Sequence, residues 1–168
     1  MNGSRLRATC AAPLLLAMTL TGHADMTETD IRDGWIQHAA RAQLHRWFLI
    51  YERPDGGIDN ALDLLADDVV VRSGLGTATG HEEYEARVAQ LPSSWRNGHV
   101  VESSTVAVGE GDRLDVTADV TYRNAGMKED GSVRVAGLDY AIGMEKGEAT
   151  LPLLTSVEIT QRDESEAG

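Results

Sequence analysis

Apolar residues recur every three or four positions along the first third of the chain, as expected for the buried face of a long helix. The residues of this face are Ile36, Ala40, Leu44, Trp47, Phe48 and Tyr51. Thr27 followed by Asp30 predicts a capped start, and the turn-forming residues 54–57 predict the end. We expect two further helices, a short one around Leu62 and one over 82–91.

After these helices the pattern changes to alternating apolar and polar positions, which is typical of strands. A short strand is predicted at Val69-Val70-Val71, and longer strands are predicted over 98–108, 113–124, 132–145 and 149–161. Helices followed by strands predict an α+β fold with about three N-terminal helices packed on a curved, mostly antiparallel sheet. We expect a single domain over 25–161 and a polar tail over 162–168.

The first predicted hairpin can be aligned if Glu110 and Gly111 form its turn. The pairs on its covered face are then His99–Tyr122, Val101–Val120, Ser103–Ala118 and Thr105–Val116. Val106 falls on the opposite face, toward water. This alignment predicts that the imidazole of His99 lies beside Tyr122 at the end of a covered, mostly apolar face.

The second predicted hairpin leaves two alternatives. A two-residue turn at Asp130-Gly131 places Asp139 opposite Tyr122, which adds a carboxylate to the face of His99. A single bulge reverses the strand and turns Leu138, Tyr140 and Ile142 inward instead. The second alternative buries larger apolar groups and is favoured on hydrophobicity, while Asp139 stays a candidate.

Composition excludes several classes of function. The formal net charge is −12, and an acidic surface repels nucleic acids and anionic membranes. Cys10 is the only cysteine and lies near the start, so the remaining chain offers no disulfide, cysteine nucleophile or thiolate site. The spacing of the helical histidines does not gather three ligands, so neither a metal nor a cofactor is predicted.

Residues 1–24 have the form of a secretory signal peptide, with two early arginines, an apolar run over 10–20 and a small-x-small end. The apolar run is too short to span a bilayer comfortably. The alternative is that the protein begins at Met26. A signal peptide predicts a periplasmic or secreted protein with no membrane segment in its mature form, and a start at Met26 predicts a cytoplasmic one.

Three segments of the chain carry a family resemblance: Leu64-Leu65-Ala66-Asp67-Asp68-Val69-Val70, Gly80-His81-Glu82-Glu83-Tyr84 and Trp95-Arg96-Asn97-Gly98-His99-Val100-Val101. They resemble the SnoaL-like branch of the nuclear transport factor 2-like superfamily. The order of predicted elements over 30–161 is similar as well. The resemblance implies a cone-shaped fold in which the sheet curls around the long helix and leaves a pocket for a small apolar or aromatic ligand. It also implies a homodimer.

The resemblance to scytalone dehydratase and polyketide cyclase relatives implies where a site would lie. Tyr51-Glu52 falls near a Tyr-Asp pair at the end of the first helix, and His99 falls near a pocket histidine. Tyr122 stands where a second histidine would be expected. We therefore predict His99, Tyr122, Tyr51 and Glu52 as catalytic residues, and Trp47, Trp95 and Asp139 as residues that bind the substrate.

Two functions remain open at this point. A partly buried His99 suits acid–base chemistry, a tyrosine can donate to an enolate, and Glu52 in an apolar pocket can act as a second base. This set predicts a cofactor-independent lyase or isomerase acting on a small apolar carbonyl compound. The alternative is a non-catalytic ligand-binding or dimerisation module, in which Trp47, Phe48 and Leu153 fill the space.

Overall fold

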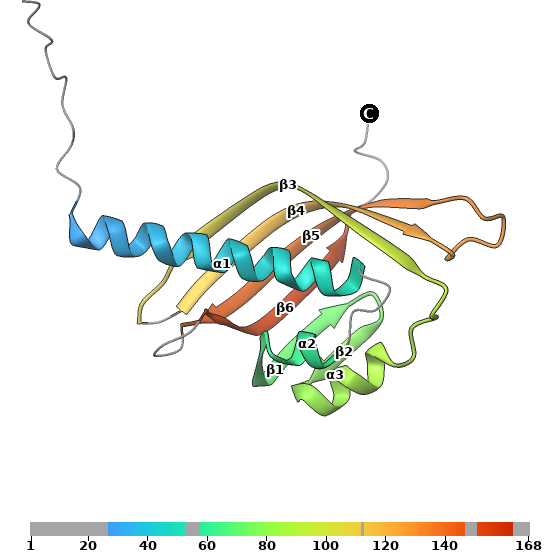
Figure 1. The fold of residues 1–168 in the computed structure, drawn as a ribbon, viewed down its shortest axis with the longest axis horizontal. Coiled ribbons are helices and arrows are strands. Elements are labelled where there is room, and N and C mark those ends of the chain that lie inside the picture. Colours follow the sequence, from blue (N-terminus) through green and yellow to red (C-terminus); the bar gives the residue numbers. More distant parts are fainter. Residues whose placement is uncertain (1–26, 53–57, 112, 147–150, 163–168) are drawn as a thin grey trace, which may run out of the picture.

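The computed structural model describes residues 27–52, 58–111, 113–146 and 151–162. In chain order its elements are α1 (Glu28–Glu52), α2 (Ile58–Leu62), β1 (Leu65–Ser73), β2 (Gly76–Thr79), α3 (Gly80–Val88), β3 (Arg96–Val108), β4 (Arg113–Ala125), β5 (Arg134–Glu145) and β6 (Leu153–Gln161) (Figure 1). The strands form one six-stranded sheet in the order β2-β1-β6-β5-β4-β3. Strands β1 and β6 are parallel, and the other neighbours are antiparallel. The predicted α+β class is confirmed, with a mixed sheet.

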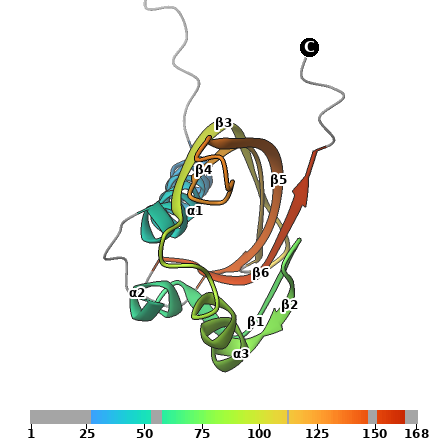
Figure 2. The same ribbon diagram turned by 90° about the vertical axis from the view of Figure 1, so that its right-hand side faces the viewer.

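The sheet is strongly curved, and α1 lies against its concave side (Figure 2). Helix α1 runs alongside the strands β3 to β6, while α2 and α3 lie beside β1 and β2 (Figure 1). The signal peptide predicted over 1–24 and most of the predicted polar tail lie outside the described residues.

Only two of the about three predicted N-terminal helices are of substantial length in the described part of the chain. Within the described residues only α1 and α3 are longer than a single short turn, because α2 is reduced to the five residues Ile58–Leu62. Strand β1 already begins at Leu65, four residues before the predicted strand, and this leaves no room for a longer helix. Residues Gly76–Thr79, for which the sequence predicted no strand, form β2, which pairs with β1.

The predicted start and buried face of α1 are confirmed. The backbone N–H of Thr27 donates to the Asp30 carboxylate at 2.9 Å, and the Asp30 N–H donates back to the Thr27 hydroxyl at 3.2 Å. Such a reciprocal pair satisfies N–H groups that the first turn of a helix leaves without partners. The buried residues of α1 are Ile36, Ala39, Ala40, Gln43, Leu44, Trp47 and Phe48. The helix therefore ends with Glu52 close to the sheet.

The predicted register of the first hairpin holds only at its His99 end. His99 pairs with Tyr122 and Val101 pairs with Val120, but the register then shifts between Val101 and Ser103. Beyond this bulge Val106 pairs with Val116 and is buried, whereas it was expected to face water. The extra residue reverses the faces of the strand, which brings a valine rather than a threonine into the core.

The second hairpin has the register that turns the large apolar groups inward. Tyr122 pairs with Ala136, and Tyr140 is buried beside Ala118. Asp139 pairs with Asp119 on the other face of the sheet. The turn at Asp130-Gly131 is part of a longer connection between β4 and β5, so the two-residue turn was the wrong alternative.

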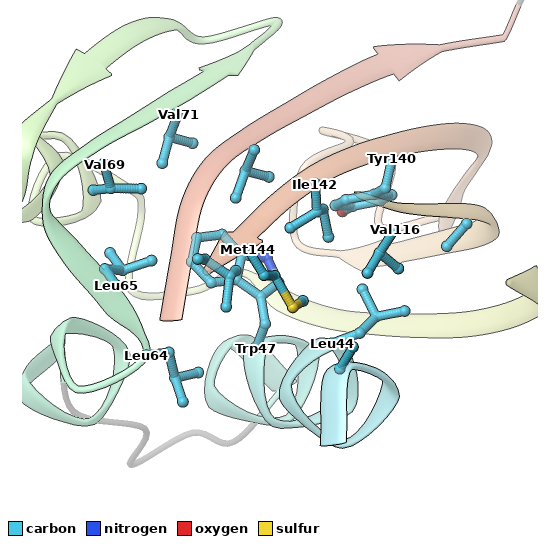
Figure 3. Packing of buried hydrophobic residues seen from close by; sticks show 14 of the residues in the cluster. Leu44, Trp47, Leu64, Leu65, Val69, Val71, Val116, Tyr140, Ile142 and Met144 are labelled. Carbon is cyan, nitrogen blue, oxygen red and sulfur yellow. The ribbon is translucent and has the colours of Figure 1, made fainter. Parts of the chain in front are cut away.

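The core fills the space between α1 and the concave face of the sheet (Figure 3). Leu44 of α1, Met144 of β5 and Val116 of β4 are fully or almost fully buried there. Gln43 is also buried in α1, and its Nε2 donates to the Pro152 carbonyl at 2.8 Å. This hydrogen bond ties α1 to the chain just before β6.

Gly126 holds the end of β4 against the segment that precedes β3. Its φ is +95°, and a Cβ there would lie 2.7 Å from the carbonyl oxygen of Ser94. We expect Gly126→Ala to lower the free energy of unfolding by roughly 2–4 kcal/mol, because strain and a steric clash add. Gly131 has a φ of +74° with no atom near its Cβ position, so Gly131→Ala is the control for strain alone. Equal losses in urea unfolding would contradict the role of the clash.

Candidate active site

A cavity of about 150 Å³ lies at one end of the core, next to α3. Side chains from α1, α3 and five strands or their flanking segments line it. The apolar or aromatic part of the lining includes Trp47, Val71, Tyr84, Val88, Trp95 and Ile159. The polar part includes Tyr51, Asn97, His99 and Tyr122. A dry cavity of about this volume accepts a molecule as large as benzene.

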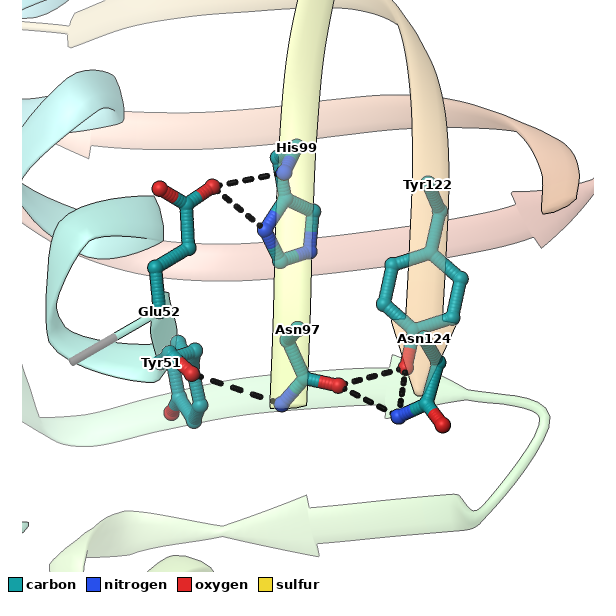
Figure 4. Close-up of polar contacts among 6 residues, drawn as sticks. All are labelled: Tyr51, Glu52, Asn97, His99, Tyr122 and Asn124. Carbon is teal, nitrogen blue, oxygen red and sulfur yellow. Dashed lines mark hydrogen bonds and ion pairs between the residues drawn. The ribbon is translucent and has the colours of Figure 1, made fainter. Parts of the chain in front are cut away.

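The imidazole of His99 is held by a carboxylate from the end of α1. Oε1 of Glu52 lies 3.2 Å from Nδ1 of His99 and accepts the backbone N–H of His99 at 2.6 Å (Figure 4). Glu52 reaches His99 because α1 continues to this residue and ends beside β3. One carboxylate oxygen therefore fixes both the backbone and the ring of the same residue.

This contact determines how the proton is distributed on the ring. A carboxylate can only accept, so Nδ1 carries the proton and Nε2 of the neutral ring keeps its lone pair. Nε2 has no hydrogen-bond partner among the described residues and lies on the side of the ring away from Glu52 (Figure 4). Burial lowers the pKa of His99 below its usual value, and Glu52 opposes part of that shift. His99 is therefore suited to act as a neutral base near pH 7.

Aromatic rings pack against His99 from two elements. Phe48 of α1 stacks on the imidazole with a centroid distance of 4.6 Å and an angle of 11° between the rings. The ring of Tyr122 lies 5.2 Å away on the other strand of the hairpin, as the register predicted. The side chain of His99 is only 7% exposed, whereas that of Glu52 is 30% exposed. Glu52 is not among the residues that line the cavity, so its contact is with His99.

A second polar group links Tyr122 to two asparagines. The hydroxyl of Tyr122 donates to Oδ1 of Asn97 at 2.7 Å, and Nδ2 of Asn124 donates to the same oxygen at 2.7 Å (Figure 4). Asn124 also donates to the Tyr122 hydroxyl at 3.0 Å. The hydroxyl proton of Tyr122 is thus already engaged. Tyr122 positions this cluster and is a poorer donor to a ligand than the sequence suggested.

Two other tyrosines supply unused donors. The hydroxyls of Tyr51 and Tyr84 are buried, and neither has a hydrogen-bond partner among the described residues. Both side chains line the cavity. Burial raises the pKa of Tyr51 far above its usual value, so this hydroxyl keeps its proton. Buried polar groups are normally paired, so these two hydroxyls without a partner among the described residues are candidate donors to an oxygen of a ligand.

The structure brings most of the predicted site residues together. His99, Tyr122, Tyr51, Trp47 and Trp95 line the cavity, and Glu52 contacts His99 from behind. Asp139 is the exception, because the register of β5 places it on the opposite face of the sheet. There its Oδ1 lies 3.3 Å from Nε of Arg162.

Four residues of the site were not predicted from the sequence: Asn97, Asn124, Tyr84 and Arg87. Strand alternation was a usable signal for the first two, because Asn97 and Asn124 lie two residues from His99 and Tyr122 on the same face. The spacing of Tyr84 indicates only a core residue of its helix. Arg87 follows it by one helical turn, yet nothing in the sequence distinguishes this arginine from an exposed one.

The described part of the chain offers no obvious metal site. No group of three or more His, Cys, Asp or Glu side chains there is arranged to hold a metal ion. None of its helices has the length and apolar character needed to span a membrane.

Comparisons with known proteins identify the fold. No family model matches the chain, and no curated protein matches it in sequence. Solved structures do match. The dehydrochlorinase LinA-type3 from Novosphingobium barchaimii is similar with a TM-score of 0.68 and 13% identity, over 82% of this chain and 92% of that one. A nuclear transport factor 2-like superfamily protein from Salmonella enterica matches with a TM-score of 0.65 and 10% identity, over 81% and 97%.

A ketosteroid isomerase-like protein from Erwinia carotovora matches with a TM-score of 0.61 and 15% identity, over 76% of this chain and 96% of that one. The three structures carry different descriptions but share one architecture with this chain. At these identities the likeness concerns the fold. The chain therefore has the nuclear transport factor 2-like fold.

Proposed function

We propose that the protein is a cofactor-independent lyase or isomerase that removes a proton from a small, largely apolar carbonyl compound. The observation that carries this proposal is the orientation of His99: Glu52 holds Nδ1 while the ring lines a mostly apolar cavity. A carboxylate that orients a histidine, whose other nitrogen faces a reactant, is a common arrangement for a general base.

The chemistry follows from the groups around the cavity. Nε2 of His99 takes a proton from the carbon next to the carbonyl, and the electron pair of that C–H bond moves onto the carbonyl oxygen. The hydroxyls of Tyr51 and Tyr84, which lack partners among the described residues, are available to donate to the resulting enolate oxygen. Return of the proton to another carbon completes an isomerisation, and departure of a group from the β-carbon completes an elimination.

The size of the cavity limits the substrate. About 150 Å³ is room for a single six-membered ring with small substituents. Apolar walls favour a substrate that buries carbon, and a low local dielectric strengthens the hydrogen bonds to a developing oxyanion. Solved structures of the same fold include a dehydrochlorinase and an isomerase-like protein, which is consistent with proton-transfer chemistry.

Of the two functions that the sequence leaves open, the cavity together with the Glu52–His99 contact supports catalysis. Trp47 and Phe48 leave the cavity open beside His99, which argues against a module that only dimerises. A module that only binds a ligand requires no imidazole held by a carboxylate, so the contact between Glu52 and His99 supports catalysis. A homodimer remains a prediction, which light scattering of the purified protein checks. Catalysis and dimerisation are compatible.

Proton removal can be tested before the substrate is known. We expect the wild-type protein to catalyse exchange of α-protons for deuterium in at least one member of a panel of cyclohexanones, acetophenones and arylacetaldehydes, each with and without a carboxylate substituent, in D₂O. Exchange is followed by loss of the α-proton signal in NMR spectra. The reference is imidazole at the same concentration, which supplies the base without the cavity. A panel in which no compound exchanges faster than with imidazole would contradict the proposal.

A further inference from the structure

The cavity contains one permanently charged side chain among the described residues that line it, and the charge is positive. This side chain is Arg87 of α3, whose guanidinium stays protonated at any physiological pH. None of the other lining residues is an aspartate or a glutamate. The local positive charge contrasts with the formal net charge of −12 for the whole protein. A cation in such a cavity is stabilised by a negative charge, which a bound ligand could supply.

The guanidinium is held in place by backbone atoms rather than by an acid. Nη1 of Arg87 donates to the Leu75 carbonyl at 2.6 Å, and Nη2 donates to the Thr77 carbonyl. Gly76 lies between these two acceptors, and a Cβ there would approach Nη1 to 2.9 Å, so glycine leaves room for the guanidinium. Arginine has five N–H donors and these bonds use two, which leaves three for a ligand.

Two arginines on the outer surface of the sheet have carboxylate partners instead. Arg113 lies 3.0 Å from Asp115, and Arg162 lies 3.3 Å from Asp139. Glu83, one turn before Arg87 on α3, accepts the backbone N–H of Thr79 at 2.7 Å. Within the described part of the chain, Arg87 forms no ion pair. Arg87 thus differs from Arg113 and Arg162 in having no carboxylate partner among the described residues.

Arg87 also marks the entrance to the cavity. It lines both the space beside His99 and an adjoining open hollow, together with Leu75, Leu91 and Trp95. Glu83 also lines that hollow, where its carboxylate accepts the backbone N–H of Thr79. The inner walls beyond this boundary are largely aromatic and aliphatic. A ligand with an anionic end and an apolar body fits this arrangement, with its anion beside Arg87 at the entrance and its body against the apolar inner walls.

We propose that the cavity binds a small aromatic or alicyclic carboxylate, with the carboxylate on Arg87 and the apolar body extending toward His99. The planar guanidinium matches a carboxylate through charge-assisted hydrogen bonds. This inference rests on the proposed function for its reaction, and it narrows the substrate to a carbonyl compound that carries a carboxylate. The binding step itself does not depend on catalysis.

Benzoate and benzamide are suitable probes, because they share a ring and a similar shape but differ in charge. We expect the wild-type protein to bind benzoate at least roughly tenfold more tightly than benzamide in calorimetric titrations. Arg87→Gln should remove this preference while leaving benzamide binding within about threefold, and Arg87→Lys should retain part of it. Arg72→Gln is the matched control, because Arg72 is exposed on the neighbouring strand β1 and does not line the cavity.

Three results would overturn the inference: no binding of benzoate by the wild type, equal affinities for the two probes, or a benzoate preference that persists in Arg87→Gln. Circular dichroism and urea unfolding show whether the variants fold. The titrations are repeated in His99→Gln, which lacks the proposed base. If the wild type prefers benzoate but catalyses no deuterium exchange, the proposed reaction is refuted and the anion site is supported. If the wild type catalyses exchange but shows no preference for benzoate, only the anion site is refuted.

Discussion

Replacement of His99 by glutamine should lower the rate of α-proton exchange by roughly 10²- to 10⁴-fold, the range that a positioned general base contributes. Glutamine has a similar length and can still accept a hydrogen bond, but its amide has no basic nitrogen at neutral pH. Because His99 packs against Phe48 and Tyr122, a polar residue of similar size disturbs the packing less than alanine would. The measurement is the initial rate of exchange for a compound that the wild type accepts.

The matched control is His45→Gln, an identical chemical change at an exposed position on α1. It should leave the exchange rate unchanged. A His99→Gln protein that folds, binds benzoate as the wild type does and still exchanges protons at the wild-type rate would exclude His99 as the base. Tyr51→Phe tests the proposed donor to the enolate oxygen, because it removes the buried hydroxyl of Tyr51 and leaves the ring in place.

Replacement of Glu52 by glutamine should lower the rate by roughly 10- to 100-fold and move its pH dependence, as expected for a residue that orients another. Two effects act together. The new amide would no longer require the proton of His99 to reside on Nδ1, so part of the population would present a protonated Nε2 to the substrate. The loss of the negative charge also makes His99 a weaker base.

The direction of the pH shift follows from the pKa of His99. Burial lowers this pKa, and the hydrogen bond and charge of Glu52 raise it. Without Glu52 only the lowering effect remains, so the pKa falls further. Because the neutral ring is the active form, the rate is lost at acid pH below the pKa of His99. The acid limb of the rate profile should therefore lie at lower pH in Glu52→Gln than in the wild type.

Glu28→Gln, an exposed change at the opposite end of α1, is the control for the profile. An acid limb that moves to higher pH in Glu52→Gln would mean that the carboxylate does not stabilise the protonated imidazole. An unchanged profile with a reduced rate would indicate a purely structural role for Glu52.

The sequence was sufficient for the α+β class, for α1 and for the His99 end of the first hairpin, because period and turn chemistry act locally. The capped start of α1, its buried face and the pairing of His99 with Tyr122 all follow from residues close together in the chain. The bulge beside Glu102 was not predictable in this way. Its position depends on which face of β3 meets the core, and that is decided by packing against α1 and not by β3 alone.

The same limit applies to the site. Alternation placed His99 on the covered face, and the resemblance pointed to Glu52, but neither indicated that Glu52 lies behind His99 rather than in the cavity. Arg87 was missed because its role depends on the carbonyls of Leu75 and Thr77, which a sequence pattern does not reveal. Every residue type has a backbone carbonyl, so the sequence does not show which carbonyls accept hydrogen bonds from a side chain.

The stack of Phe48 on His99 has a consequence for the energy of the proposed intermediate. Once His99 has taken a proton, a cationic imidazolium lies parallel to an aromatic face at a centroid distance of 4.6 Å. The negative face of the ring attracts a cation by roughly 0.5–2 kcal/mol, more when water is excluded. Phe48 thus favours the charged state that burial disfavours, and it does so without adding a second base. A residue of the hydrophobic core would thus stabilise the protonated form of the proposed base.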